Sequence, residues 1–465
     1  MPKSEFTIRK VCQHLWQLER DNDLINLDIC GIKIWQLIRF QLFTKITEEL
    51  QIYGQAHTQK NNFVDKLKYF PRMIFNSIFK NPMQGRYTRD YIIFDHPRKM
   101  KLNNYSFDIY THYFIKTLED EQYDVVEAPY LYKHLKNFSS KNRRYSDAIK
   151  LKVFLSKHIS SLKISTREEN RIKHLETIIN KTFNTNLYLV NFIKSNAFFF
   201  KHQYHYYFNL LKKRRPSKIY ILVSYGSVSL ISAAKDLGIE VIEFQHGVIT
   251  DYHFGYNFGD PTQFIEYFPD KILTFGDYWG HTKGFPEQTK IEVYGFPYLE
   301  QQLEMYKGTP KRNNQVLILS QGTIGKKLSV KAKEIAQEMP DYYFIYKLHP
   351  GEYDRWKSEY PDLVEASTFE NLEVIDHNEK SLYSYFAESE FQIGVNSTAI
   401  FEGMTLGCKT ILVNLQGIEY MDDLINENIV MLADNSSSCI KAIKDFKVEE
   451  FDKEYFFKSR KDMKQ

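Results

Sequence analysis

Residues 394–403 place phosphate- and sugar-binding side chain types directly after an apolar run. Asn396, Ser397 and Thr398 follow that run, and Glu402 lies one helical turn beyond Thr398. Ser and Thr at a helix start can cap the helix, and the exposed N–H groups there attract phosphate. On the same helix face, a Glu402 carboxylate can accept hydrogen bonds from ribose hydroxyls. The pattern predicts a phosphate-binding helix start; the alternative is an ordinary cap followed by a solvated Glu.

Two further loops in this half of the chain have a similar character. The first contains Lys347, His349, Pro350 and Gly351, where the Lys and His can neutralise a phosphate and the Pro-Gly pair forces a turn. Here the alternative is a turn with a buried, hydrogen-bonded His. The second loop supplies small residues and a hydroxyl after another apolar run, and its members are Ser320, Gln321 and Gly322. Polar loops after successive parallel strands predict one donor-binding site.

The first half of the chain contributes a His after an apolar run. His246 lies between Gln245 and Gly247. Because His titrates near neutral pH, it suits proton transfer from an acceptor hydroxyl, and a Gly beside it lets the chain turn and present the ring. We expect His246 to be catalytic and Gln245 to contact the acceptor. The alternative is a structural His at the end of a strand.

A rival cluster follows the first strand of the chain. Asp95 could serve as the base, with His96 beside it, and Arg98 could hold an anionic group of the acceptor. Tyr225, which follows a later strand, is a weaker candidate for acceptor contact.

These loops need strands to position them, and the apolar runs alternate with helical patterns in both halves. Such alternation predicts parallel sheets covered on both faces. Two such units imply a GT-B-like architecture of two Rossmann-type, doubly wound domains, with ligands between the carboxyl ends of their strands. A helix is expected over 108–118, and the predicted strands are 91–94, 123–127, 219–223, 240–244, 271–275, 291–294, 316–319, 342–346, 372–375, 391–395 and 410–413.

The expected organisation has a helical N-terminal region, two sheet domains and a tail. The predicted boundaries are 1–85 for the helical region, 86–300 for the acceptor domain with a basic helical insertion at about 135–215, a polar linker at 300–314, 301–450 for the donor domain and 451–465 for the tail. Residues 63–79 mix cations with Phe and Ile at helical spacing. That segment is either an amphipathic helix on an anionic membrane surface or a helix packed on the protein.

Composition narrows the class of protein. The chain has 465 residues, 43% hydrophobic and 26% charged, which argues for folded domains and against wholesale disorder. A net charge of +4 does not indicate a nucleic-acid partner. The four cysteines lack metal-ligand spacing, so we expect reduced thiols, no metal and no cofactor. Without an apolar signal core or an apolar run of roughly 18 residues, a cytoplasmic protein is expected.

Four segments together resemble the bacterial capsule and lipopolysaccharide glycosyltransferases of the GT-B kind. These segments are 94–98, 244–247, 347–350 and 396–398 with Glu402. The His-Pro pair with the Ser-Thr pair is similar to that of the sialyl and Kdo transferases, which use CMP-sugars. The resemblance implies that His349, Ser397 and Thr398 bind the donor phosphate and nucleotide. The Gln-His-Gly segment resembles the Trp-His-Gly of CDP-glycerol polymerising enzymes, which implies that His246 is the base.

The sequence therefore predicts a metal-independent glycosyltransferase. It would move a sugar from a nucleotide-sugar, with a CMP-sugar favoured, to a capsule or lipopolysaccharide glycan that is free or lipid-linked. Peripheral contact with the cytoplasmic face of the inner membrane is a further expectation. The alternatives are a polyol-phosphate transferase, a sugar-nucleotide epimerase of the same fold, or a nucleotide-sugar-binding scaffold in a capsule assembly complex.

Overall fold

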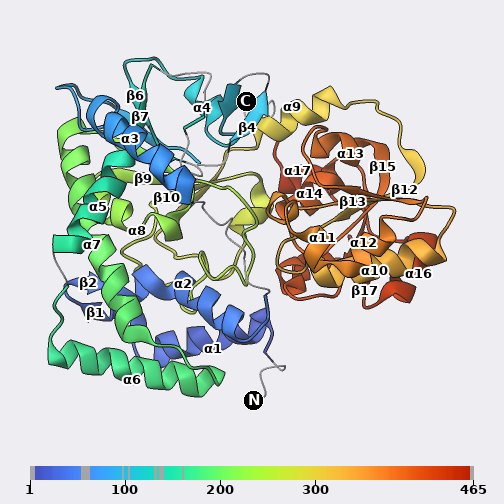
Figure 1. Ribbon diagram of the computed structural model, residues 1–465, viewed down its shortest axis with the longest axis horizontal. Coiled ribbons are helices and arrows are strands. Elements are labelled where there is room, and N and C mark those ends of the chain that lie inside the picture. The colour runs from blue at the N-terminus through green and yellow to red at the C-terminus, as the bar shows by residue number, and fades with distance from the viewer. Residues whose placement is uncertain are drawn as a thin grey trace.

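The structure, a computed structural model, describes residues 6–53, 63–96, 99–102, 105–129, 134–135, 141–159 and 162–460, with the side chains of 63–67 and 154–159 left undescribed. The chain forms two lobes side by side (Figure 1). The first lobe is built on a seven-stranded sheet and the second on a six-stranded sheet. Two small antiparallel hairpins, β1–β2 and β4–β5, complete the strands.

The first-lobe sheet is entirely parallel, in the order β11-β10-β9-β8-β3-β6-β7. The chain begins in the middle at β3, builds outward to β7 and then returns to β8, so the topological switch point lies between β3 and β8. The strands are β3 (Tyr91–Phe94), β6 (Tyr123–Glu127), β7 (Arg143–Tyr145), β8 (Lys218–Ile221), β9 (Glu240–Phe244), β10 (Lys271–Thr274) and β11 (Lys290–Val293).

The second-lobe sheet repeats this plan in the order β14-β13-β12-β15-β16-β17, again all parallel. Its switch point lies between β12 and β15. The prediction of two Rossmann-type, doubly wound sheets in a GT-B-like pair is confirmed by these strand orders. The strands are β12 (Arg312–Leu319), β13 (Tyr343–Lys347), β14 (Leu372–Ile375), β15 (Ser389–Gly394), β16 (Lys409–Val413) and β17 (Met431–Ala433).

Helices cover both faces of each sheet, because alternate strand residues point to opposite sides. On β12, Val316 and Ile318 pack with α10 (Gly325–Glu338), while Leu317 and Leu319 join the larger core. On the first sheet, α7 (Leu189–Arg214) and α8 (Val228–Lys235) pack on one face and the short α4 (His112–Ile115) on the other. The remaining cover of the second sheet comes from α12 (Pro361–Ala366), α13 (Leu382–Glu388), α14 (Thr398–Thr405) and α16 (Ser436–Lys444).

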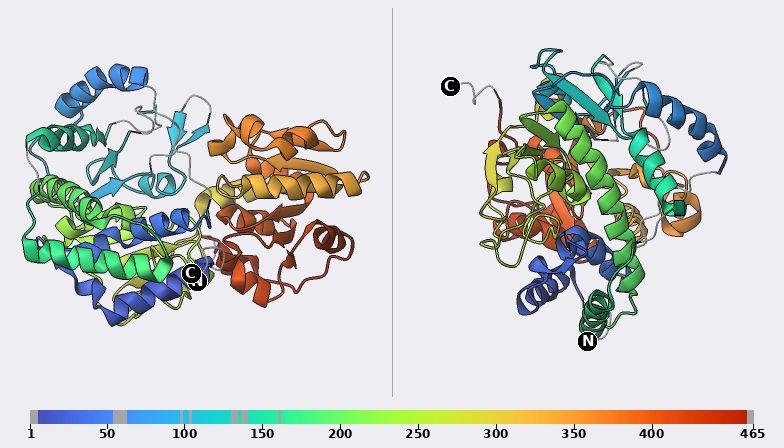
Figure 2. Two further views of the ribbon diagram at one scale, coloured as in Figure 1. Left: turned by 60° about the horizontal axis from the view of Figure 1, so that its bottom comes forward. Right: turned by 90° about the vertical axis from the view of Figure 1, so that its left-hand side faces the viewer.

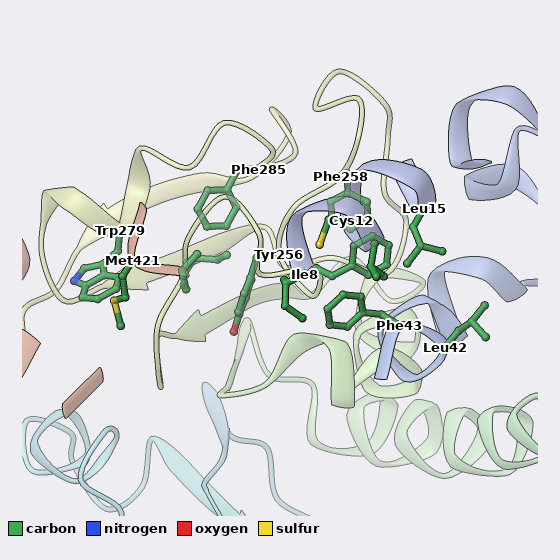
Figure 3. Close-up of a cluster of buried hydrophobic side chains, with 14 of the residues drawn as sticks. Ile8, Cys12, Leu15, Leu42, Phe43, Tyr256, Phe258, Trp279, Phe285 and Met421 are labelled. Carbon is green, nitrogen blue, oxygen red and sulfur yellow. The ribbon is translucent and has the colours of Figure 1, made fainter. Parts of the chain in front are cut away.

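The predicted helical N-terminal region is present as three helices. They are α1 (Ile8–Asp21), α2 (Ile34–Glu49) and α3 (Phe63–Phe79), with a small hairpin of β1 (Asp28–Ile29) and β2 (Ile32–Lys33) between the first two. Figure 3 shows the apolar side chains of α1 and α2 packed against the loops that follow β9, including Tyr256 and Phe258. Buried Arg39 fastens this contact, since it donates to Glu19 over 2.9 Å and to the Asn257 carbonyl over 2.9 Å.

Short elements account for most differences from the sequence prediction. The helix expected over 108–118 is reduced to α4 (His112–Ile115), preceded by a hairpin of β4 (Met100–Leu102) and β5 (Tyr105–Phe107). The edge strands β7 and β17 were not predicted, since three residues are too few for a recognisable pattern. The other elements are α5 (Asp147–Ile159), α6 (Thr166–Phe183), α11 (Trp356–Glu359), α15 (Asp422–Asn426) and the single turns Leu24–Asn26, Ser224–Gly226, Asp277–Gly280, Pro350–Glu352 and Ile418–Met421.

The predicted linker is wrong at both ends. Helix α9 (Pro297–Met305) occupies its first part and β12 already begins at Arg312, so only residues 306–311 connect them. Beyond α16 the chain crosses back to the first lobe through α17 (Lys453–Phe456). There the Phe456 carbonyl accepts a hydrogen bond of 2.6 Å from the Trp279 ring nitrogen, so the last described segment belongs structurally to both lobes.

None of the helices in the described part of the chain is long and apolar enough to cross a bilayer.

We expect Gly276→Ala to loosen the returning C-terminal segment. A β-carbon at Gly276 would lie 2.5 Å from the Tyr455 carbonyl oxygen and 2.6 Å from that of Phe456, so the backbone must shift. Such overpacking costs about 1–3 kcal/mol. Urea denaturation measures the loss in the free energy of unfolding. The control is Gly226→Ala, where the nearest atom is 3.5 Å away; equal effects of the two substitutions would contradict the packing argument.

Candidate functional site

Three predicted loops of the second lobe lie at one edge of its sheet. They follow β13, β12 and β15, which are neighbours in that order, and parallel strands all end at the same edge. The loops touch: the Gln321 amide donates to Asn396 Oδ1 over 3.3 Å. Gln321, Gly322 and Asn396 are half-buried, so the loops are partly accessible.

A buried carboxylate ties two of these loops together. Glu352 accepts hydrogen bonds from Ser320 Oγ (2.9 Å), the His349 backbone N–H (2.7 Å) and Tyr360 OH (2.8 Å). Burial raises the pKa of Glu352, although these hydrogen bonds oppose the increase. The Ser320 hydroxyl is thus bound to the protein, which corrects its expected contact with the donor. Sequence reasoning missed Glu352, whose signal was a Glu three residues after His349.

Arg355 is a second residue that the sequence analysis missed. Its guanidinium donates to the Gly322 carbonyl over 2.8 Å, to the Gly351 carbonyl over 3.1 Å and to Glu359 over 2.6 Å. A half-buried cation therefore lies beside both loops, held in place by two backbone oxygens. It can supply positive charge where Lys347 was expected to do so.

Lys347 lies at this edge, but its ammonium is bound by the protein. Its ammonium donates to the His377 carbonyl (3.0 Å), the Leu348 carbonyl (3.2 Å) and Tyr353 OH (2.5 Å). Burial lowers its pKa to about 8. All these partners belong to the loops after β13 and β14, so Lys347 joins those loops, and its contact with a phosphate stays a prediction.

His349 is half-buried at the start of the Pro350–Glu352 turn. Its Nδ1 accepts a hydrogen bond of 3.1 Å from the Gly351 backbone N–H. An accepting Nδ1 selects the neutral tautomer that carries its proton on Nε2. The ring is therefore a hydrogen-bond donor through Nε2, which suits an anionic oxygen.

Helix α14 begins as the sequence predicts, with Ser397 as its N-cap. The Ser397 hydroxyl accepts a hydrogen bond of 3.2 Å from the Ala399 N–H. Thr398 is half-buried at the first helical position. The hydroxyl of Ser397 thus serves the cap, while the helix start and Thr398 remain the phosphate-binding candidates.

Glu402 is half-buried one turn into α14. Burial raises the pKa of its carboxyl to about 7, although a hydrogen bond with the Tyr383 side chain opposes the increase. Tyr298, on the helix α9 that joins the lobes, is close enough for the Glu402 charge to act on it. The carboxyl therefore lies where the second lobe meets the connection between lobes, and it can accept or donate a proton near neutral pH.

The loop after β9 approaches the second lobe. A β-carbon built on Gly247 would lie 3.7 Å from Thr398 Oγ1, so the backbone next to His246 meets the start of α14. The His246 side chain is 18% exposed. Burial first, and then the nearby His253 and His96, lower its pKa to about 3. His246 is therefore a neutral imidazole at physiological pH; it can accept a proton, but a pKa this low makes it a weak base.

A buried tyrosine and carboxylate stand behind His246. Tyr256 OH donates to Glu243 Oε1 over 2.5 Å and lies 3.4 Å from His246 Nδ1. Glu243 Oε1 is itself 3.9 Å from His246 Nδ1. Burial raises the pKa of Glu243 to about 7, opposed by the hydrogen bonds from Tyr256 and Ser224. Tyr256 gave no local signal in the sequence, because it enters from a loop ten positions further along the chain.

Gln245 holds this loop and does not face the acceptor. Its amide nitrogen donates to the Gly247 carbonyl over 2.8 Å, and its amide oxygen accepts from the Phe275 N–H over 2.8 Å. Only 1% of the residue is exposed. The predicted acceptor contact is therefore replaced by a positioning role for the His246 loop.

The rival cluster after β3 is only partly supported. Asp95 is buried between Lys99 and Arg143; burial opposes ionisation, but these two cations outweigh it and lower the pKa. An ion-paired carboxylate is a poor base, so the catalytic prediction for Asp95 is corrected to a structural role.

The His96 ring lies 6.3 Å from the His246 ring, and so does the ring of Tyr225, measured between centroids. Both residues therefore join the His246 site.

Arg98, predicted to hold the acceptor, lies outside the described residues. Where the chain is described, no group of three or more His, Cys, Asp or Glu side chains is arranged to hold a metal ion.

A separate pocket of about 250 Å³ also lies between the lobes. It is lined by Arg9 of α1, by loop residues of the first lobe such as Asp251 and Lys283, and by second-lobe residues including Glu419 and Asp422. Its lining includes none of the predicted site residues. Arg9 pairs with Asp422 over 2.5 Å, so this pocket is where α1 docks on the second lobe.

No model of a known protein family matches the sequence, and no curated protein matches it. Among solved structures, the chain is similar to the UDP-GlcNAc 2-epimerase of Methanocaldococcus jannaschii (13% identity, TM-score 0.44, covering 76% of this chain and 91% of that one). It is also similar to the UDP-GlcNAc 2-epimerase of Neisseria meningitidis bound to UDP-GlcNAc (13%, TM-score 0.42, 76% and 90%) and to Acinetobacter baumannii MurG (10%, TM-score 0.41, 78% and 90%). Likeness at this level assigns no reaction and no residue role.

Glu402→Gln should flatten the dependence of stability on pH. Because the pKa of Glu402 in the folded protein is about 7, the folded state favours the protonated carboxyl. The stability that this carboxyl contributes is fully present below 4.5, the ordinary pKa of a Glu side chain, and is lost as the pH rises through 7. The parent should therefore lose stability between about pH 5 and about pH 8, and the variant should lose less. Urea titrations at several pH values measure this. Glu338→Gln, at an exposed position, is the control; identical slopes in parent and Glu402→Gln would contradict the burial of Glu402.

Proposed function

We propose that this protein is a glycosyltransferase that moves a sugar from a nucleotide-activated donor to a hydroxyl group of a surface glycan. The observation that carries the proposal is the approach of Gly247 to Thr398 Oγ1. It brings a neutral, partly exposed His next to a helix start that can hold an anionic leaving group. Base and phosphate site are the two elements that such a transfer needs.

The donor would bind to the second lobe. The start of α14 with Thr398, the Nε2–H of His349 and the guanidinium of Arg355 would stabilise the charge that develops on the departing phosphate. Gln321, Gly322, Gly351 and Asn396 would line this site through their loops. Glu402 would accept a hydrogen bond from a ribose hydroxyl.

His246 would remove the proton of the acceptor. In this reaction the acceptor oxygen forms a bond to the anomeric carbon while the bond from that carbon to the phosphate oxygen breaks. The phosphate leaves with the electron pair, and Nε2 of His246 takes the hydroxyl proton. The Tyr256 oxygen would accept a hydrogen bond from Nδ1–H of His246, while the Tyr256 hydroxyl donates to Glu243. These contacts would stabilise the imidazolium that forms. His96 and Tyr225 would contact the acceptor.

We further propose a CMP-sugar as the donor and a capsule or lipopolysaccharide glycan, free or lipid-linked, as the acceptor. The pairing of His349 and Pro350 with Ser397 and Thr398 resembles that of the sialyl and Kdo transferases. The residues that bind the donor supply cations and N–H groups, so the proposed chemistry does not need a metal. The alternatives differ in their products: a polyol-phosphate transferase would transfer a polyol phosphate, an epimerase would isomerise the sugar nucleotide, and a binding scaffold would form no product.

His246→Ala should reduce transfer by about 100- to 10,000-fold, the usual contribution of a general base. Binding of the nucleotide should be unchanged, because the nucleotide lies on the other lobe. Tyr256→Phe should lower kcat with little effect on the donor KM and should shift the pH profile. His281→Ala, an exposed histidine, is the control. Full activity of His246→Ala, or a sugar nucleotide that is isomerised without any acceptor, would rule out the proposed mechanism.

Thermal unfolding with CMP, CDP, UDP and GDP tests the donor site. Saturation at about 100 times Kd stabilises the native state by about 2.7 kcal/mol, so the correct nucleotide should raise Tm clearly. We expect CMP to have the largest effect, with weaker binding in Thr398→Val and Arg355→Gln. Thr368→Val, at an exposed position of the same lobe, should bind like the parent. Equal binding in all variants would place the nucleotide elsewhere.

A further inference from the structure

Helix α3 exposes a strip of large apolar side chains, while its buried side carries hydrogen-bonding groups. Tyr69, Met73 and Asn76 face inward and are less than a tenth exposed. The Tyr69 hydroxyl and the Asn76 amide both donate to Asp147 at the start of α5. The outward side carries five large apolar residues with high exposed fractions: Phe70 (45%), Ile74 (38%), Phe75 (53%), Ile78 (52%) and Phe79 (60%).

A helix on the surface of a protein in water normally turns such large apolar side chains inward. The exposed residues follow helical spacing, since 70, 74 and 78 form one row and 75 and 79 form the next. They therefore make one continuous apolar strip, which differs from the scattered exposed residues that any protein has. Figure 2 shows α3 at the outer edge of the first lobe, away from the second lobe.

The surroundings of the strip are basic. Lys68 and Arg72 are exposed on the same helix. Between positions 68 and 89 the chain contains five Lys or Arg residues and no Asp or Glu. An apolar strip flanked by cations is complementary to lipids with anionic headgroups, because the side chains enter the acyl boundary while the cations meet phosphate.

We propose that α3 is a membrane-surface helix that lies on an anionic bilayer with Phe70, Ile74, Phe75, Ile78 and Phe79 inserted. This contact goes beyond the proposed reaction and does not depend on it. In the membrane-bound state α3 would lie parallel to the bilayer, while its polar side keeps the hydrogen bonds to Asp147.

The buried polar groups under α3 set the distance between this surface and the first-lobe sheet. Asp147 accepts from His134 Nε2 over 2.7 Å, and His134 Nδ1 lies 2.8 Å from Glu127 at the end of β6. Arg143 joins Glu127, over 2.7 Å, to Asp95 at the end of β3. A chain of buried contacts thus runs from α3 to the strand end that precedes His96, so a bilayer under α3 would be held close to the acceptor side.

Flotation of the full-length protein with lipid vesicles tests the proposal. Vesicles of phosphatidylglycerol and phosphatidylcholine in equal amounts should bind the parent, and vesicles of phosphatidylcholine alone should bind it more weakly. Phe75→Ser with Phe79→Ser should reduce binding at least about tenfold, because two large apolar side chains no longer enter the bilayer. Lys68→Gln with Arg72→Gln should reduce only the electrostatic part of vesicle binding, which is the part that added salt weakens.

The matched control is Phe264→Ser with Met305→Ser, two residues that are 64% and 60% exposed outside α3. This control should bind vesicles like the parent, and all variants should keep the parent Tm because the changed side chains are exposed. Equal vesicle binding by the Phe75/Phe79 variant and the control would overturn the proposal. So would a dimer of the parent, detected by analytical ultracentrifugation, that the same variant dissociates, since a second copy would then cover the strip.

Discussion

The contact between Gly247 and the start of α14 constrains how the two lobes face each other. A β-carbon built on Gly247 would lie 3.7 Å from Thr398 Oγ1, an ordinary van der Waals distance, so the backbone at Gly247 lies close to the start of α14. The loop that carries His246 and the helix start that can hold a phosphate are thereby brought to one interface. Each lobe alone has a polar edge at its topological switch point, and only their apposition brings His246 close to the start of α14.

Buried carboxylates hold the loops of this interface from behind in both lobes. Glu352 accepts hydrogen bonds from the Ser320 hydroxyl and the His349 backbone N–H. Glu243, behind His246, accepts a hydrogen bond from the Tyr256 hydroxyl. Burying a carboxylate is unfavourable unless its oxygens are hydrogen-bonded, so these groups are stable only with the loops in place. The hydrogen bonds therefore hold the loops from within the protein, as preorganised groups require.

The first lobe has two different polar regions. Near β9, burial keeps His246 neutral and raises the pKa of Glu243 to about 7. Under α3, by contrast, Asp95, Glu127 and Asp147 contact Lys99, Arg143 and His134 in one buried network. The buried network under α3 is thus distinct from the surroundings of His246, and the apolar strip of α3 lies over that network.

The sequence determined the elements whose signal is local. Alternation of apolar strands and helices predicts both parallel sheets, and the Ser-Thr pair after β15 predicts the cap of α14, because these patterns depend on neighbours within a few residues. The tertiary structure decided which polar atoms are available. Lys347, Ser320 and Gln245 carry suitable groups, but burial gives them partners within the protein. Tyr256 and Arg355 join the site from outside the predicted motifs, because hydrogen bonding and charge depend on distances in space that no spacing along the chain records.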